Sequence, residues 1–399
     1  MQKFYKTFFQ TFYFKTYLVI IFLLSVLFLS QKFLYPSDWT TSEWLINYQG
    51  GFVRRGFIGE IVYKIHEFSD LNLRYLVFYF EIFLLAIFFI LIYNFFKKTY
   101  LNELLIFLFF CPIFLIYPLA ENEVLVRKEY LFFSIYLIYL NLILRNNKYF
   151  YFIILFCLPI MNLTWDGMIF YIYFFIFSFL CKKKINTKEI VLYFLSFVPY
   201  LISLYFVIVS KSNPYGLDQM CISINENCFG AMLALDKSLI WNIEFVTSRF
   251  QINYFFTYFI LITLSFLPIL IFSYFDNFKI FINRYKINKP LFKLNIILII
   301  SILVFMLIGY DWGRWINIGF TFAILTIFFL IKNNNINFLE NYLFKITKKF
   351  YNNYSKIYYF IFFCYIFTWN MKVIMTDDIG SFPYYRILNK TIKIIGMYI

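Results

Sequence analysis

Two uncharged apolar runs constrain this chain more than any other feature. YLVIIFLLSVLFLS covers residues 17–30 and LNIILIISILVFMLIGY covers residues 294–310, and neither contains a charged side chain. An apolar run of about 18–20 residues has the length of a membrane-spanning helix. Because 62% of the 399 residues are hydrophobic, the chain also has more apolar surface than a soluble core of this size requires. The sequence therefore predicts an all-α, polytopic integral membrane protein.

We expect eleven spans within a single transmembrane domain, residues 1–399. They lie at roughly residues 17–35, 75–96, 103–119, 130–144, 149–163, 167–181, 189–209, 253–275, 294–310, 316–331 and 357–374. A basic N-terminus favours a cytoplasmic start under the positive-inside rule. The predicted outer loops are then residues 36–74, 120–129, 164–166, 210–252, 311–315 and 375–399. This topology leaves the C-terminus outside.

Lysine and arginine distribute differently over this topology. Most lysines fall in the inner loops, as the positive-inside rule expects. Seven of the nine arginines fall in the outer loops, namely Arg54, Arg55, Arg74, Arg127, Arg249, Arg314 and Arg386. The net charge of +15 does not indicate a nucleic-acid partner, because the basic residues sit in short loops between apolar segments. The outer face is where we expect the functional site.

The first outer loop contains the stretch that most favours an anion site. GGFVRRG, residues 50–56, precedes apolar residues that repeat at helical spacing over residues 57–68. That spacing predicts an amphipathic helix lying on the membrane surface. Arg54 and Arg55 would lie near its N-terminus, where free backbone N–H groups and the helix dipole favour an anion. Their guanidinium groups match phosphate oxygens in two-point contact, so we expect them to bind a phosphate.

The same two arginines have a structural alternative. They would instead pair with Glu43 and Glu60, or contact lipid headgroups. Headgroup contact does not explain the glycines at positions 50 and 51, which suit a sharp turn or a close approach of the backbone to a ligand.

Three further outer segments place charges between apolar spans. AENEVLVRKEY contains Arg127, MNLTWDGM contains Asp166, and GYDWGRWI contains Asp311 and Arg314. A charge at the edge of a membrane is costly unless it is paired or hydrated, so these residues are functional candidates. The alternative for Asp311 and Arg314, which are three residues apart, is a salt bridge on one helical face.

The tryptophans gather on the same predicted side. All seven fall in outer loops or near outer helix ends, although an aromatic belt normally forms at both interfaces. Four of them directly adjoin an acid, in the pairs Asp38–Trp39, Glu43–Trp44, Trp165–Asp166 and Asp311–Trp312. A flat ring beside a hydrogen-bonding carboxylate suits a sugar, and interfacial anchoring is the alternative.

Several kinds of site find no support in the sequence. The single histidine, His66, has no cysteine or histidine partners at zinc spacing, and no nucleotide-binding motif occurs. No cofactor or metal is required, although two outer carboxylates would suffice for a divalent cation. Cys221 and Cys228 share the long outer loop and are candidates for a disulfide in an oxidising compartment.

The general plan resembles bacterial O-antigen or capsule repeat-unit polymerases of the Wzy type and the wider C-type glycosyltransferase superfamily. The segments that carry the resemblance are GGFVRRG, TWDG and DWGRW. It implies glycosyl transfer at the outer face of a bacterial inner membrane from a polyprenyl-(pyro)phosphate-linked sugar. Membrane lipids and other polysaccharide-assembly membrane proteins are the implied partners.

The resemblance also implies roles for particular residues. The pyrophosphate would be bound by Arg54, Arg55, Arg127 and Arg314. The general base would be one of four carboxylates, Asp38, Asp166, Glu43 or Asp311. The sugars would stack on Trp39, Trp44, Trp165 and Trp312. The competing class is a transporter, such as a lipid-linked-oligosaccharide flippase or an anion carrier. Apolar inner halves of the spans and the lack of an internal repeat favour the enzyme.

Overall fold

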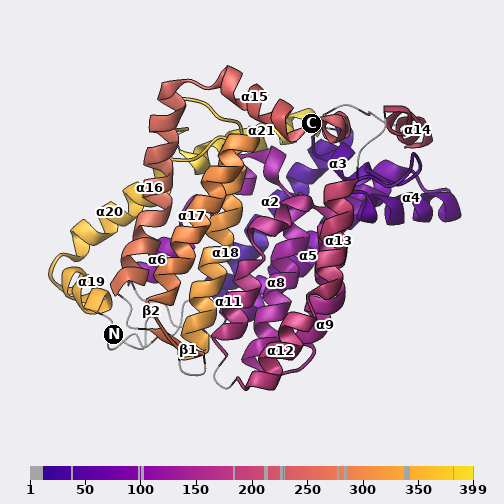
Figure 1. Cartoon of the computed structure of the whole chain (residues 1–399). Coiled ribbons are helices and arrows are strands. Elements are labelled where there is room, and N and C mark those ends of the chain that lie inside the picture. The colour runs from indigo at the N-terminus through magenta and orange to yellow at the C-terminus, as the bar shows by residue number, and fades with distance from the viewer. Residues whose placement is uncertain are drawn as a thin grey trace.

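The computed structural model describes most of the chain. The described residues are 12–36, 39–97, 99, 103–182, 185–210, 214–224, 228, 230–275, 278–282, 285–336, 342–380 and 382–398. Within them the chain is almost entirely helical, and the longer helices stand side by side in a bundle (Figure 1).

Among the described residues, six helical segments are long and apolar enough to cross a membrane. They are α2 (Phe12–Leu34), α5 (Leu73–Phe96), α12 with α13 (Thr187–Leu195 and Val198–Val209), α16 (Ile252–Phe275), α17 (Pro290–Ile308) and α18 (Trp312–Lys332). The predicted all-α membrane architecture is confirmed in these segments. The count of eleven spans stays a prediction, because the other five expected spans are shorter or interrupted helices.

Those five regions contain α6 (Glu103–Phe109), α7 (Tyr117–Ala120), α8 (Glu129–Leu144), α9 (Phe150–Phe152), the π-helical turn η3 (Ile153–Cys157), α10 (Leu158–Thr164), the 3-10 turn η4 (Asp166–Phe170), α11 (Tyr173–Leu180) and α20 (Ser355–Phe367). Between α6 and α7 the chain is irregular yet buried at residues 111–116. Asn317 of α18 donates hydrogen bonds to the carbonyls of Ile113 and Phe114 there. Irregular backbone is tolerated at such depth where protein groups satisfy its carbonyls.

Helix α18 forms the core of the bundle. In its most apolar window, 94% of the residues are buried, against 33–39% in each of the other long segments. It packs against α8, α11, α16 and α17. Asp311 and Arg314 lie at the N-terminal end of α18, so they are placed where several helices meet.

Short elements gather at the end of the bundle where α18 begins, at the top of Figure 1. They are α3 (Thr41–Leu45), α4 (Phe57–Ser69), η2 (Asn122–Val124), α14 (Pro214–Ile224), η5 (Leu233–Asp236), α15 (Leu239–Arg249) and α21 (Pro383–Tyr398). All of them fall in the predicted outer loops, so we call this the loop-rich end. Which side of a membrane it faces stays a prediction.

The opposite end carries α19 (Tyr342–Asn353) and a small exception to the all-α expectation. Strands β1 (Lys279–Ile282) and β2 (Tyr285–Asn288) form an antiparallel hairpin in which Lys279 pairs with Asn288. The hairpin falls between the spans expected at residues 253–275 and 294–310.

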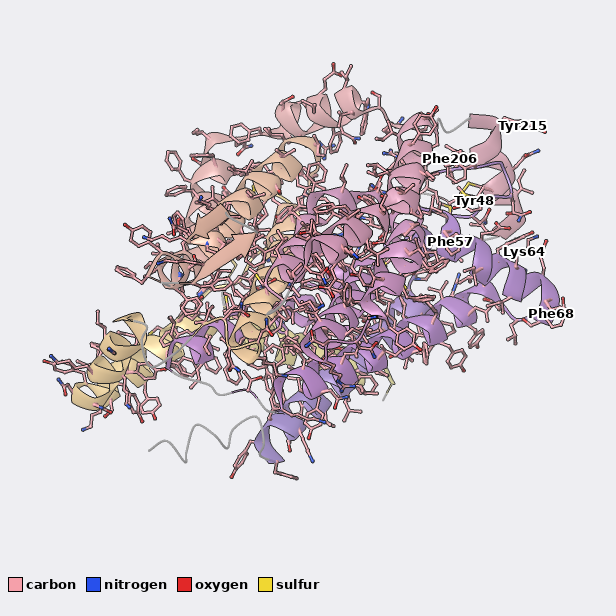
Figure 2. All side chains as sticks on the ribbon, turned by 60° about the horizontal axis from the view of Figure 1, so that its bottom comes forward. Tyr48, Phe57, Lys64, Phe68, Phe206 and Tyr215 are labelled. Carbon is pink, nitrogen blue, oxygen red and sulfur yellow. A yellow bond between two sulfur atoms is a disulfide. The ribbon has the colours of Figure 1, made fainter. Side chains whose placement is uncertain are left out.

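The predicted amphipathic helix of the first outer loop is present as α4. It runs away from the bundle, with Phe57 near its root and Phe68 at its free end (Figure 2). Ile61, Ile65 and Phe68 expose their side chains. An exposed apolar face on a helix beside the bundle fits the predicted position in the membrane interface.

Residues 369–380, which we call the strap, fold back over the start of α18. The Gly313 N–H donates to the Val373 carbonyl at 3.1 Å, and the Met375 N–H donates to the Tyr310 carbonyl at 3.1 Å. A Cβ on Gly313 would lie 2.0 Å from the Lys372 carbonyl oxygen. Only glycine allows the strap backbone to lie this close to α18.

We expect Gly313→Ala to destabilise the fold by about 1–3 kcal/mol, because the added methyl group must push the strap backbone away. The matched control is Gly396→Ala in α21, where a Cβ meets nothing within 4 Å. The thermal midpoint of each purified variant should be measured in one detergent. A Gly313→Ala midpoint equal to that of the control would contradict this packing.

Candidate functional site

The first outer segment is held in shape by buried contacts. Short helix α3 buries Glu43 and Trp44. A turn over residues 46–56 follows, in which Gly51 has φ +101° and Arg55 has φ +69°. Glu60 at the start of α4 accepts hydrogen bonds from the Tyr48 N–H at 2.9 Å and from the Gln49 side chain at 3.1 Å. Glu60 therefore serves the turn and leaves both arginines free for other partners.

The long outer loop packs directly on this turn. A Cβ on Gly50 would lie 1.8 Å from the Gly216 carbonyl oxygen, so α14 approaches as closely as two glycines permit. Cys221 of α14 forms a disulfide with Cys228, and their Cα atoms lie 5.5 Å apart. On the bundle side, Phe206 of α13 contacts Phe52 edge to face.

Arg54 and Arg55 both bind Asp166, which follows α10 at the start of η4. Arg55 Nε lies 2.8 Å from Asp166 Oδ1, and Arg54 Nη1 lies 3.3 Å from Asp166 Oδ2. The structure thus pairs these arginines with Asp166 and not with Glu43 or Glu60. Two segments predicted separately, GGFVRRG and TWDG, meet in one place.

Arg127 and Arg314 meet behind this pair. Arg127 Nε donates to Glu43 Oε2 at 2.9 Å, and Arg314 Nε donates to Glu129 Oε1 at 2.6 Å. Arg314 Nη2 also lies 3.7 Å from Glu43 Oε1. These four side chains join α3, α8 and α18 at the loop-rich end.

Asp311 links to the same arginines from the N-cap position of α18. Its Oδ2 lies 3.2 Å from Arg314 Nη1 and 3.4 Å from Arg127 Nη1. The salt bridge expected between Asp311 and Arg314 on one helical face is therefore present. Its extension to Arg127 was not foreseen.

Together with Lys128, these residues form what we call the charged cluster, which comprises Glu43, Arg54, Arg55, Arg127, Lys128, Glu129, Asp166, Asp311 and Arg314. Its ion pairs divide by exposure. The closed layer has side chains at most 5% exposed and consists of Glu43, Glu129, Arg127 and Arg314. The open layer has side chains 17–29% exposed and consists of Arg54, Arg55, Asp166 and Asp311. Only the open layer offers atoms to an incoming molecule.

Electrostatics keep two carboxylates of the cluster ionised. Burial acts to raise the pKa of Glu43, but the nearby guanidinium groups of Arg127 and Arg314 hold that pKa well below its usual range. Burial likewise acts on Asp166, and Arg55 and Arg54 lower its pKa below the ordinary value. Both carboxylates are acceptors of hydrogen bonds at neutral pH.

The four tryptophans proposed to stack on sugars differ in exposure. Trp39 is 50% exposed, whereas Trp44, Trp165 and Trp312 are buried. Trp165 lies parallel to Trp315, at 6.4 Å between ring centroids, and Trp44 packs against Phe80. The three buried rings contact protein in this structure, and Trp39 is the most exposed of the four.

Sequence reasoning missed the parts played by Glu129 and Lys128. Both stand in AENEVLVRKEY, the segment from which only Arg127 was singled out above. The sequence feature that could have identified Lys128 and Glu129 is their position at the start of an apolar span, where an unpaired charge is costly. Asp38, one of the four candidate bases, lies outside the described residues.

Comparisons with known proteins add no assignment. No protein-family profile, curated protein or solved structure matches the chain. Within the described residues, no three histidine, cysteine or acidic side chains come together as a group able to hold a metal ion. The arrangement of the charged cluster is therefore the basis for any functional proposal.

We expect Glu43→Gln to destabilise the protein by about 3 kcal/mol, because it leaves Arg127 and Arg314 buried with too little negative charge. Since the folded-state pKa of Glu43 is lowered, the stabilisation is complete at neutral pH and is lost only as the pH falls through that low pKa.

The matched control is Glu67→Gln, which removes an exposed partner of Lys64 on α4 and should change stability little. Unfolding midpoints of both variants in one detergent provide the measurement. Equal midpoints for the two variants would show that the closed layer is not a stabilising network.

Proposed function

We propose that the protein is a membrane glycosyltransferase of the polysaccharide-polymerase type. It acts at the outer face of a bacterial inner membrane on polyprenyl-(pyro)phosphate-linked sugars. The observation that supports the proposal is the open layer, in which two guanidinium groups and two carboxylates lie next to a closed ionic network. Such a layer combines an anion-binding group with a proton acceptor, which are the two elements that this transfer requires.

The anion-binding element is Arg54 with Arg55. Arg54 Nη1 contacts Asp166, whereas Nη2 has, among the described residues, only long contacts of 3.4–3.5 Å to the carbonyls of Ala234, Leu235 and Lys237. Hydrogen bonds of this length are weak, so phosphate oxygens would replace them readily. The cluster as a whole has five cationic side chains and four carboxylates. Its excess of positive charge favours an anionic ligand.

The transfer step breaks the bond between the sugar C1 and the phosphate oxygen. The bonding electrons leave with the (pyro)phosphate, where Arg54 and Arg55 stabilise the charge that develops. The acceptor hydroxyl oxygen forms the new bond to C1, and its proton passes to a carboxylate. Arg127 and Arg314 act from the closed layer, where they fix the carboxylates and add positive field without touching the phosphate.

We assign the base to Asp311 among the described candidates. Glu43 is 1% exposed, pairs with Arg127 at 2.9 Å and lies 3.7 Å from Arg314. Asp166 is occupied by the two arginines that would bind phosphate. Asp311 also contacts two arginines, but among the described residues both contacts use Oδ2, whereas Asp166 uses both of its oxygens. Asp311 also keeps 28% of its side chain exposed at the open layer. Trp39, the exposed ring, is the candidate for contact with a sugar.

The alternative is a flippase for lipid-linked oligosaccharides or another anion transporter. It would use the same arginines without breaking a bond. The two functions predict different accumulated species when the protein is removed from its host, so one experiment separates them.

We expect cells that lack the protein to accumulate carrier lipid bearing single glycan units in the outer leaflet.

Arg54→Gln and Arg55→Gln should each lower transfer by about a hundredfold or more, because each removes a donor to the departing phosphate. The matched control is Arg249→Gln, an outer arginine of α15 that stacks on Phe245. This variant should restore normal glycan.

Extraction and leaflet-resolved analysis of lipid-linked glycans provides the measurement. Full rescue by both Arg54→Gln and Arg55→Gln would remove these residues from the site. Accumulation confined to the cytoplasmic leaflet would instead identify a flippase.

A further inference from the structure

We propose that Lys128 is a positioning residue for the anion site and couples anion binding to the uptake of one proton. The inference rests on the proposed function, since it concerns the same pair of arginines. It adds a residue that touches neither phosphate nor sugar and acts through the backbone of Arg55.

Lys128 lies between the closed and open layers. It is the N-cap residue of α8 and is 0% exposed. Its Nζ donates a hydrogen bond to the Arg55 carbonyl at 2.7 Å, and it lies 5.9 Å from the centroid of the Trp44 ring. Within the described part of the chain, this hydrogen bond joins the start of α8 to the backbone of Arg55.

The carbonyl that Lys128 binds belongs to a strained residue. Arg55 has φ +69°, a left-handed conformation that is unfavourable for a residue with a side chain. Two contacts hold it there, namely Lys128 on its carbonyl and Asp166 on its side chain. Strain kept by surrounding contacts is a common feature of functional sites. Loss of the Lys128 contact should let Arg55 relax away from Arg54.

The buried ammonium of Lys128 is poorly satisfied. An ammonium has three donors, and among the described residues only the Arg55 carbonyl accepts from it. No carboxylate of the described chain lies within 4.0 Å of Nζ as an ion-pair partner. Burial without a direct counter-ion favours the neutral amine. It lowers the pKa of Lys128 to about 7.

The charged groups that face Lys128 come from every neighbouring element. Glu43 of α3, Asp166 of η4 and Glu129 of α8 favour the ammonium, whereas Arg55 opposes it. With Lys128 protonated, the cluster has five positive and four negative charges. With Lys128 neutral, the two signs balance. Protonation of this one side chain therefore strengthens the attraction of the cluster for an anion.

The sign of the pH dependence follows directly. An anion bound at Arg54 and Arg55 favours the charged form of Lys128 and so raises its pKa. Affinity is then greatest below about pH 7 and falls as the pH rises through the pKa of the free protein. Asp166 and Glu43 do not contribute over this range, because their pKa values are lowered.

The test uses the purified full chain in nanodiscs of zwitterionic lipid, with sulfate as the probe. Sulfate is a tetrahedral dianion whose charge is constant near neutral pH, so any pH dependence belongs to the protein. We expect the Kd for sulfate to rise about tenfold between about pH 6 and pH 8.5, the change that a one-unit pKa shift produces. Titration calorimetry in two buffers of different ionisation enthalpy should show proton uptake near pH 7.

Lys128→Met should bind sulfate weakly and equally at both pH values. The control is His66→Asn on α4, which removes the only histidine of the sequence. The Nδ1 atom of His66 contacts the Leu71 carbonyl just beyond α4. The His66→Asn variant should keep the wild-type dependence of sulfate affinity on pH. A flat profile in the wild-type protein, or no proton uptake, would overturn the role of Lys128 even if the Lys128→Met protein proves unstable.

The same measurements distinguish this inference from the proposed function. Sulfate binding could disappear in the Arg54→Gln variant while sulfate binding to the wild-type protein shows no pH dependence. In that case the anion site stands and the role proposed for Lys128 is wrong. If wild-type protein does not bind sulfate, or if binding survives Arg54→Gln and Arg55→Gln together, the anion site itself is wrong and this inference fails with it.

Discussion

The pairing of buried charges at the loop-rich end is the constraint on which the rest of this structure depends. Glu43, Arg127, Glu129 and Arg314 are nearly inaccessible to water, and an unpaired charge in such a place costs several kcal/mol. Each residue lies on a different element or turn, so none is satisfied unless α3, α8 and α18 converge. The charges therefore select one packing of helices whose apolar surfaces alone would permit several.

The closed and open layers follow from this convergence. The strap lies across Gly313 at the start of α18, and α14 lies against Gly50, so backbone covers both flanks of the cluster. Arg54, Arg55, Asp166 and Asp311 stay at the margin, where water reaches them. The closed layer is a rigid ionic network with a few accessible groups at its edge. Electrostatic stabilisation of a ligand favours such an arrangement, because the groups are oriented before the ligand arrives.

Local sequence patterns predicted some features of this protein and missed others. The helix after GGFVRRG was predicted from apolar spacing alone and is present as α4. The partner of Arg54 and Arg55 was not predicted correctly, since Asp166 lies more than a hundred residues away in the chain. The five expected spans that prove short or interrupted depend on contacts such as that of Asn317 with the carbonyl of Phe114. Hydropathy records no such contact.

The sequence by itself determined the membrane class of this protein, the position of its amphipathic helix and the residue types at its charged end. Those properties depend on composition and on spacings of a few residues, which are local. Only the tertiary structure decided which arginine meets which carboxylate, which tryptophans are covered, and that Lys128 is buried beneath Arg55. Partners and exposure depend on how separate helices pack, and that is settled by long-range complementarity of charge and shape.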